Sequence, residues 1–122
     1  MSIPILKQGT TLIVSLQAEP TDAEFGALQT DLTRRVTETH AKGVVLDVTA
    51  LDVLDSFATR TLREIAQTVT LCGARAAIVG IQPEVAFAMA QLGLSLEGTL
   101  TALDLEDGLA LLHAMPAVAV VG

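Results

Sequence analysis

The stretch GVVLDVTALDVLDSFATRTL, residues 43–62, contains the transition that decides the fold. Its first six residues are β-branched and almost continuously apolar, which is typical of a strand covered on both faces. After Ser56 the period changes, and apolar side chains recur at spacings of four and three: Ala58, Leu62, Ile65, Val69 and Cys72. The stretch therefore predicts a buried strand, a short connection and a helix that Ser56 caps and that buries one stripe, Cys72 included.

Strands and helices alternate along the whole chain. Apolar runs at residues 11–17, 74–81 and 100–103 predict further strands, and residues 3–7 are expected to add one more, separated by Gly9. Such alternation is typical of parallel strands joined by right-handed crossovers. The sequence therefore predicts a single α/β domain over residues 1–122, with a mixed sheet of about five strands and about four helices.

Local signals set the ends and the buried faces of the other helices. Thr21 and Glu24 have the spacing of a capping box, Pro83 suits a first helical turn, and Asp104 is expected to cap the last helix. Gly43 is expected to end the first helix. The side chains expected to point inward are Phe25, Leu28, Leu32, Val36, Val85, Met89, Leu92, Leu105, Leu109 and Leu112.

The composition argues against several classes of function. Seven basic residues stand against fourteen acidic ones, a net charge of −7, so neither nucleic acid nor an anionic membrane is an expected partner. The absence of Trp and Tyr, with only three Phe, disfavours a stacked small-molecule site. One cysteine permits no internal disulfide. Because neither a signal peptide nor a membrane span is recognisable, a cytoplasmic location is expected.

The apolar content points to association with other chains. Half of the residues are apolar, which is a high fraction for a short soluble chain. Some of that surface is therefore expected to be buried between subunits. The pattern of the apolar tail at residues 116–122 assigns it no role inside the domain. The tail is therefore a candidate for such a contact.

Signatures of catalysis are missing from the sequence. It contains no nucleophile elbow, phosphate-binding loop, dinucleotide fingerprint or zinc-protease motif. His40 and His113 fall late in predicted helices, where a cation suits the helix dipole. Asp47 and Asp52 are read as turn and cap residues in preference to Mg²⁺ ligands. The protein is expected to be neither an enzyme nor a holder of a metal or cofactor.

Ser56 is the residue with two open interpretations. Serine is a preferred N-cap, worth about 1 kcal/mol, and the cap alone explains its presence. The same position is accessible at the edge of an open sheet, where a helix N-terminus tolerates a phosphate. A phosphate there would add negative charge beside Asp52 and Asp55, with no Lys or Arg between Gly43 and Thr59. A docked partner would then be repelled without unfolding of the domain.

The segments GVVLDVTALDVLDSFATRTL, GARAAIVGIQPEVA and QLGLSLE together resemble the STAS domain of anti-sigma factor antagonists. IPIL, DSF, GIQP and TALDLEDGL are more narrowly similar to the RsbS-like scaffold proteins of the bacterial stressosome, a stress-response complex. The resemblance covers residues 3 to about 112. DSF and GIQP together are fairly specific, whereas each alone is weak.

The resemblance implies a non-catalytic phosphoprotein of signal transduction. Such proteins bind a switch serine/threonine kinase of the GHKL type and assemble with sensor-bearing STAS paralogues into a large hetero-oligomer. The kinase phosphorylates the serine of the D-S motif, here Ser56, and is then released; a PP2C-like phosphatase resets the serine. Sensor paralogues carry a second phosphorylatable Thr, at a position matched here by Ala88. The residues expected at the partner surface are Asp52, Asp55, Ser56, Phe57, Thr59, Gln82 and Pro83.

Three alternatives remain open from the sequence. A sporulation-type antagonist would bind an anti-sigma kinase directly, without a large scaffold. A bare STAS-like domain would use Ser56 only as a cap. A hydrolase with Ser56 as nucleophile is the weakest alternative, because the sequence supplies no recognisable base.

Overall fold

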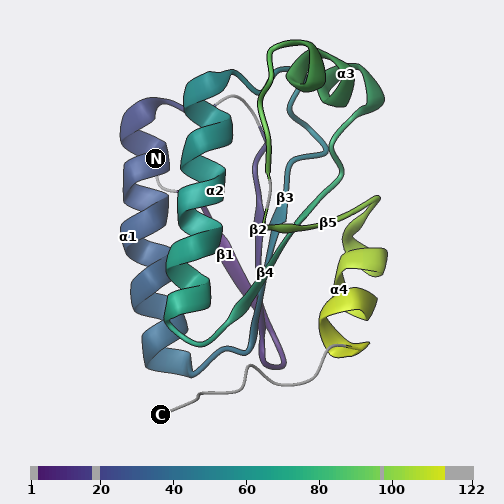
Figure 1. Ribbon diagram of the computed structural model, residues 1–122. Helices are drawn as coiled ribbons and strands as arrows, with labels where there is room; N and C mark the ends of the chain where they lie inside the picture. Colours follow the sequence, from purple (N-terminus) through teal and green to yellow (C-terminus); the bar gives the residue numbers. More distant parts are fainter. Residues whose placement is uncertain (1–2, 18–19, 97, 115–122) are drawn as a thin grey trace.

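The computed structural model describes residues 3–17, 20–96 and 98–114, which form one five-stranded sheet with helices on both faces (Figure 1). The strands lie in chain order: β1 (Ile5–Gln8), β2 (Thr11–Ser15), β3 (Gly43–Asp47), β4 (Arg75–Val79) and β5 (Leu100–Ala102). β1 and β2 form an antiparallel hairpin, and the remaining neighbours pair in parallel. The predicted mixed sheet is confirmed.

Two long helices cover one face of the sheet and one short helix covers the other (Figure 1). α1 (Asp22–Thr39) and α2 (Ser56–Leu71) lie side by side on the first face, and α4 (Leu105–Ala114) lies against β3, β4 and β5 on the second. α3 (Pro83–Gln91) lies at the same end of the sheet as the N-terminus of α2. In the part of the chain that the structure describes, no helix is long and apolar enough to cross a membrane.

The larger core lies between the sheet and the paired helices. The α1 stripe predicted from the sequence is buried throughout, and its side chains meet those of α2 and of β2 to β4. A smaller core lies under α4, where Leu112 and the half-buried Leu105 and Leu109 contact Val45 and Val79. Leucine, valine, isoleucine and alanine supply nearly all of this packing, as the composition predicts.

Most of the predicted helix signals are confirmed. The Thr21 hydroxyl accepts from Glu24 N at 3.1 Å and Glu24 Oε1 accepts from Thr21 N at 3.0 Å, which completes the capping box and lowers the pKa of Glu24. Pro83 is the first residue of α3. Asp104 caps α4 by accepting from Asp107 N at 2.8 Å.

Three expectations about the helices are wrong. α1 ends at Thr39 with His40 in the left-handed conformation at φ 54°, and Gly43 instead opens β3. Cys72 is exposed because it follows the last turn of α2, where the buried stripe stops. Leu92 is 67% exposed because it likewise follows the last turn of α3. The tail at residues 116–122 lies outside the described residues.

A close approach joins the loops that follow β3 and β4. Asp47 Oδ1 accepts from both Thr49 N at 2.9 Å and the Thr49 hydroxyl at 2.6 Å, which makes Asp47 a turn residue as predicted. Gln82 Nε2 donates to Thr49 O at 2.7 Å. Gly80 has φ +82°, and a Cβ placed on it would overlap the Thr49 side chain. These contacts, here called the loop brace, hold the connection before α2 against the one before α3.

The loop brace predicts that Gly80→Ala is strongly destabilising. A left-handed alanine costs about 1–2 kcal/mol, and overpacking against Thr49 adds about 1–3 kcal/mol. Gly73→Ala is the matched control, because Gly73 has φ +97° with open space around its Cβ position. Urea denaturation should show a clearly larger loss for Gly80→Ala. Equal losses for the two variants would contradict the steric role of the close approach.

Candidate functional site: the N-terminus of α2

Ser56 lies where the parallel strands end and α2 begins. The last hydrogen bond between the β3 segment and β4 joins Val48 N to Val79 O at 3.0 Å. The connection then turns, and Leu51 N donates to Val48 O at 3.0 Å. Leu51 and Leu54 are buried and anchor the connection in the core. Asp52, Val53 and Asp55, between and after them, are exposed. The loop therefore presents a short series of polar and apolar groups on a fixed frame.

Asp55, not Ser56, is the cap of α2. Asp55 Oδ1 accepts from Ala58 N at 2.8 Å, and the Asp55 backbone is extended. Ser56 is the first helical residue, so the expectation that it caps the helix is wrong. The reason is register: the connection places the carboxylate one residue earlier, where it satisfies a backbone donor that would otherwise be free. The negative charge at this end of the helix also suits the helix dipole.

The Ser56 hydroxyl is consequently uncommitted. Its side chain is exposed, and among the described residues it has no hydrogen-bond partner. Neither histidine is placed to act as its base, since His40 follows α1 at its C-terminal end and His113 lies in the last turn of α4, and the neighbouring Asp55 carboxylate is engaged in the helix cap. The arrangement does not activate the serine as a nucleophile. It does leave the oxygen open to an external group.

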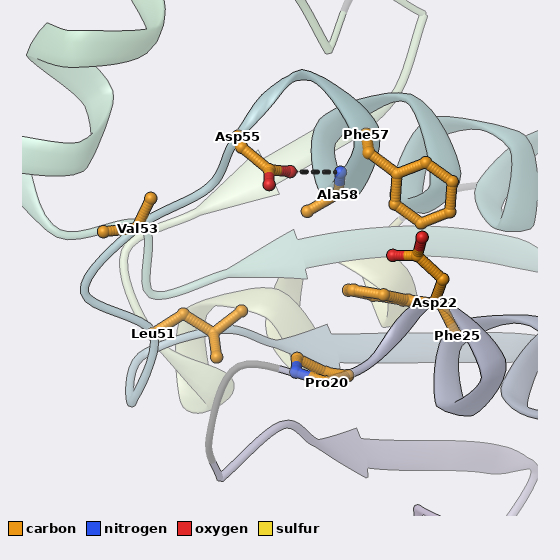
Figure 2. Close-up of a pocket in the computed structure, with 8 residues that line it drawn as sticks. All are labelled: Pro20, Asp22, Phe25, Leu51, Val53, Asp55, Phe57 and Ala58. Carbon is orange, nitrogen blue, oxygen red and sulfur yellow. Dashed lines mark hydrogen bonds between the residues drawn. The ribbon is translucent and has the colours of Figure 1, made fainter.

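A small hollow at the start of α2 is lined by six apolar residues and two carboxylates (Figure 2). Its volume is about 70 Å³, well below the roughly 300 Å³ of small-molecule sites. Phe57 packs edge-to-face on Phe25, with ring centroids 6.4 Å apart, and so ties the start of α2 to α1. The lining residues are Pro20, Asp22, Phe25, Leu51, Val53, Asp55, Phe57 and Ala58.

The exposed part of this region is named the switch surface, and it consists of Asp22, Asp52, Val53, Asp55, Ser56 and Phe57. Val53 is 55% and Phe57 42% exposed. Sequence reasoning identified four of these six residues but missed Asp22 and Val53. Asp22 comes from the start of α1, and no local signal relates it to Ser56. Val53 follows the acidic Asp52 in an irregular connection, where periodicity gives no face.

The other residues predicted at the partner surface lie in different surroundings. Gln82 is half-buried and holds the loop brace, whereas Pro83 is exposed at the start of α3. Thr59 is only 2% exposed, and its hydroxyl has no hydrogen-bond partner in the described part of the chain. It belongs to the buried face of α2, together with Ala58 and Leu62. Its side chain is therefore not exposed for direct contact with a partner.

The acidic residues at this edge do not form a metal site. Asp47 is engaged with Thr49, while Asp55 holds the helix cap. Across residues 3–17, 20–96 and 98–114, no group of three His, Cys, Asp or Glu side chains is placed to hold a metal ion. The switch surface thus combines exposed carboxylates, apolar side chains and an exposed hydroxyl.

The family of the protein follows from this fold and from similarity to known proteins. A family model described as the STAS domain matches residues 2–107, so the chain belongs to the STAS-domain family. The curated protein "RsbT co-antagonist protein RsbRA" of Bacillus subtilis (strain 168) is 28% identical over 92 residues. That match covers 69% of this chain but 34% of RsbRA, so the chain spans about a third of that relative's length.

Two solved structures are similar over nearly the full length of both chains. A serine-to-glutamate variant of RsbS from Moorella thermoacetica is 37% identical, with a TM-score of 0.78, over 91% of this chain and 94% of that one. A chain of the stressosome, described as a signal integration and transduction hub, is 35% identical, with a TM-score of 0.74, over 90% and 96%. The protein is a stressosome-related STAS protein of the non-catalytic antagonist and scaffold group, as its sequence signatures predict.

The geometry at the start of α2 predicts different roles for Asp55 and Ser56 in stability. Asp55→Ala removes the cap and should lower the free energy of unfolding by about 1 kcal/mol. Asp55→Asn should be nearly neutral, because asparagine caps equally well. Ser56→Ala should change stability by less than about 0.5 kcal/mol. Thermal denaturation of the three variants is the measurement, and a larger loss for Ser56→Ala than for Asp55→Ala would contradict the assignment of the cap.

Proposed function

We propose that the protein is a stressosome scaffold and anti-sigma factor antagonist that holds a GHKL-type switch kinase and releases it when Ser56 is phosphorylated. The observation that carries the proposal is the exposed, uncommitted hydroxyl of Ser56 on a helix whose cap is supplied by Asp55. The proposal places the protein in the bacterial cytoplasm, with a PP2C-like phosphatase to restore the serine. The similarity to RsbS and to a stressosome chain supports this assignment over an unrelated binding role.

The fold can accept a phosphate at Ser56 without rearrangement. The hydroxyl makes no hydrogen bond to any described residue, so its esterification breaks no contact that the structure records. Asp55 keeps the cap in place, and the N-terminus of a helix favours an anion. A serine that served as the cap would instead lose its hydrogen bond on modification. Because Asp55 and not Ser56 caps the helix, modification of Ser56 leaves the cap and its contribution to stability in place.

A phosphate would change the switch surface mainly through its charge. Phosphorylation adds about 1.5–2 negative charges at neutral pH. The surface already exposes the carboxylates of Asp22, Asp52 and Asp55 around the apolar side chains of Val53 and Phe57. The proposal requires a partner that places apolar or acidic groups, and no cation, opposite Ser56, because a cation there would be attracted by the phosphate. Added negative charge then repels the partner, and the phosphate places a bulky hydrated group beside the apolar contact.

The scaffold role is favoured over a sporulation-type antagonist that works without a large assembly. Large apolar side chains are exposed well away from the switch surface: Leu6 at 64%, Leu71 at 89%, Phe87 at 67% and Leu103 at 84%. They lie on β1, at the end of α2, on α3 and after β5. These side chains are candidates for contacts in a larger assembly, and the similarity to a stressosome chain supports that assignment. Contacts with sensor-bearing STAS paralogues and further copies of the chain would cover them.

The phosphorylation site is the first test of the proposed function. With the switch kinase and Mg-ATP, mass spectrometry should find one phosphate per chain, on Ser56. Phosphorylation, or Ser56→Asp, should weaken kinase binding in a pull-down or titration, whereas Ser56→Ala should bind the kinase and prevent release. Circular dichroism should show all forms folded.

Two outcomes of that experiment would count against the switch. A phosphate found on Thr61 or on another hydroxyl would show that the assignment of the site to Ser56 is wrong. Equal kinase affinity of the folded Ser56→Ala variant and of the phosphorylated protein would exclude charge as the mechanism.

The scaffold role predicts assembly. Light scattering should show that the protein, alone or mixed with a sensor-bearing STAS paralogue, forms particles much larger than one chain. Single charges on the exposed apolar side chains, such as Phe87→Glu or Leu103→Glu, should reduce that size and leave the domain folded. The matched control is Gln8→Glu, which introduces the same single negative charge at an exposed position of β1 that is already polar. A monomer that does not enlarge with the paralogue would exclude the scaffold and favour the sporulation-type antagonist.

A further inference from the structure

Arg60 is the first cationic residue after Ser56 and lies one turn further along α2. Residues four apart on a helix are neighbours, with Cβ atoms about 5–6 Å apart. Helical side chains lean toward the N-terminus, so the long side chain of Arg60 leans toward Ser56. Both residues are exposed, and within the described ranges Arg60 has neither an ion-pair nor a hydrogen-bond partner.

The other charged groups around the start of α2 are acidic or already engaged. Arg63, the next cation along the helix, donates from Nη1 to Ser95 O at 3.0 Å. The acidic groups come from the β3–α2 connection and from the three helices at this end of the sheet: Asp22, Asp47, Asp52, Asp55, Glu64 and Glu84. A phosphate on Ser56 therefore meets one uncommitted cation on its own helix and several carboxylates around it.

We propose that Arg60 is the internal counterion of phosphorylated Ser56, a role that rests on the proposed phosphorylation of this serine. The planar guanidinium offers two parallel N–H donors that match a pair of phosphate oxygens. The ion pair holds the phosphate over the first turn of α2 and favours its doubly charged form. It also withdraws from a docked partner the one cation that the described residues leave uncommitted in the N-terminal half of α2. Phosphorylation thus adds negative charge and engages the nearby guanidinium in an internal ion pair.

The test measures the ionisation of the phosphate itself. Phosphoserine is installed at position 56 during translation, without any kinase, and the second pKa of the phosphate is followed by phosphorus NMR. A nearby cation favours the dianion, so this pKa should be lower in the wild-type protein than in Arg60→Gln by about 0.4 units. Lys7→Gln removes the same charge from β1, beside the N-terminal end of β2, and should leave the pKa unchanged. Arg60→Lys should restore part of the shift.

Ionic strength supplies the second readout. The difference between the wild-type protein and Arg60→Gln should shrink at 1 M salt, where charges on a surface are screened within about 3 Å. Equal phosphate pKa values in the wild-type protein and in Arg60→Gln at low salt would overturn the ion pair. Because no kinase is used, that result would leave the proposed phosphorylation standing. A kinase that fails to modify Ser56 would overturn the proposed function and leave the measured ion pair intact.

Discussion

The hydrogen bond from Ala58 N to Asp55 Oδ1, 2.8 Å long, is the contact on which the rest of the site depends. It fixes the first residue of α2 and satisfies a backbone donor at the helix end. Because the carboxylate supplies the cap, the neighbouring hydroxyl of Ser56 makes no hydrogen bond that holds the helix. Such a hydroxyl can be modified and restored repeatedly while the helix stays in place.

The sheet supplies the frame that makes this arrangement rigid. Parallel strands β3 and β4 end at the same edge, and the loop brace of Asp47, Thr49, Gly80 and Gln82 joins the loops that leave them. The Phe25–Phe57 ring contact ties the start of α2 to α1. These contacts hold the switch surface in place, so in the proposed function a change of its charge acts on the partner while the fold is kept.

Much of the fold could be predicted from the sequence, because its signals are local. The buried run in β3, the capping box at Thr21, and Pro83 at the start of α3 each depend on a few adjacent residues. The site was predicted only in part. Which of two adjacent polar residues caps α2 depends on the path of the loop, and the burial of Thr59 depends on how α2 is rotated against the sheet. Asp22 and the contact between Gln82 and Thr49 are brought in by segments distant in sequence, for which one chain carries no visible signal.

In the proposed function, phosphorylation of Ser56 acts through charge on a surface that keeps its shape. This is tested by calorimetric titration of the switch kinase with the unmodified protein and with the protein carrying phosphoserine at position 56, at low and at high salt. We expect weaker binding of the phosphorylated form, with a difference that shrinks as salt screens the charges. Equal affinities at low salt, or a difference that does not depend on salt, would contradict this mechanism.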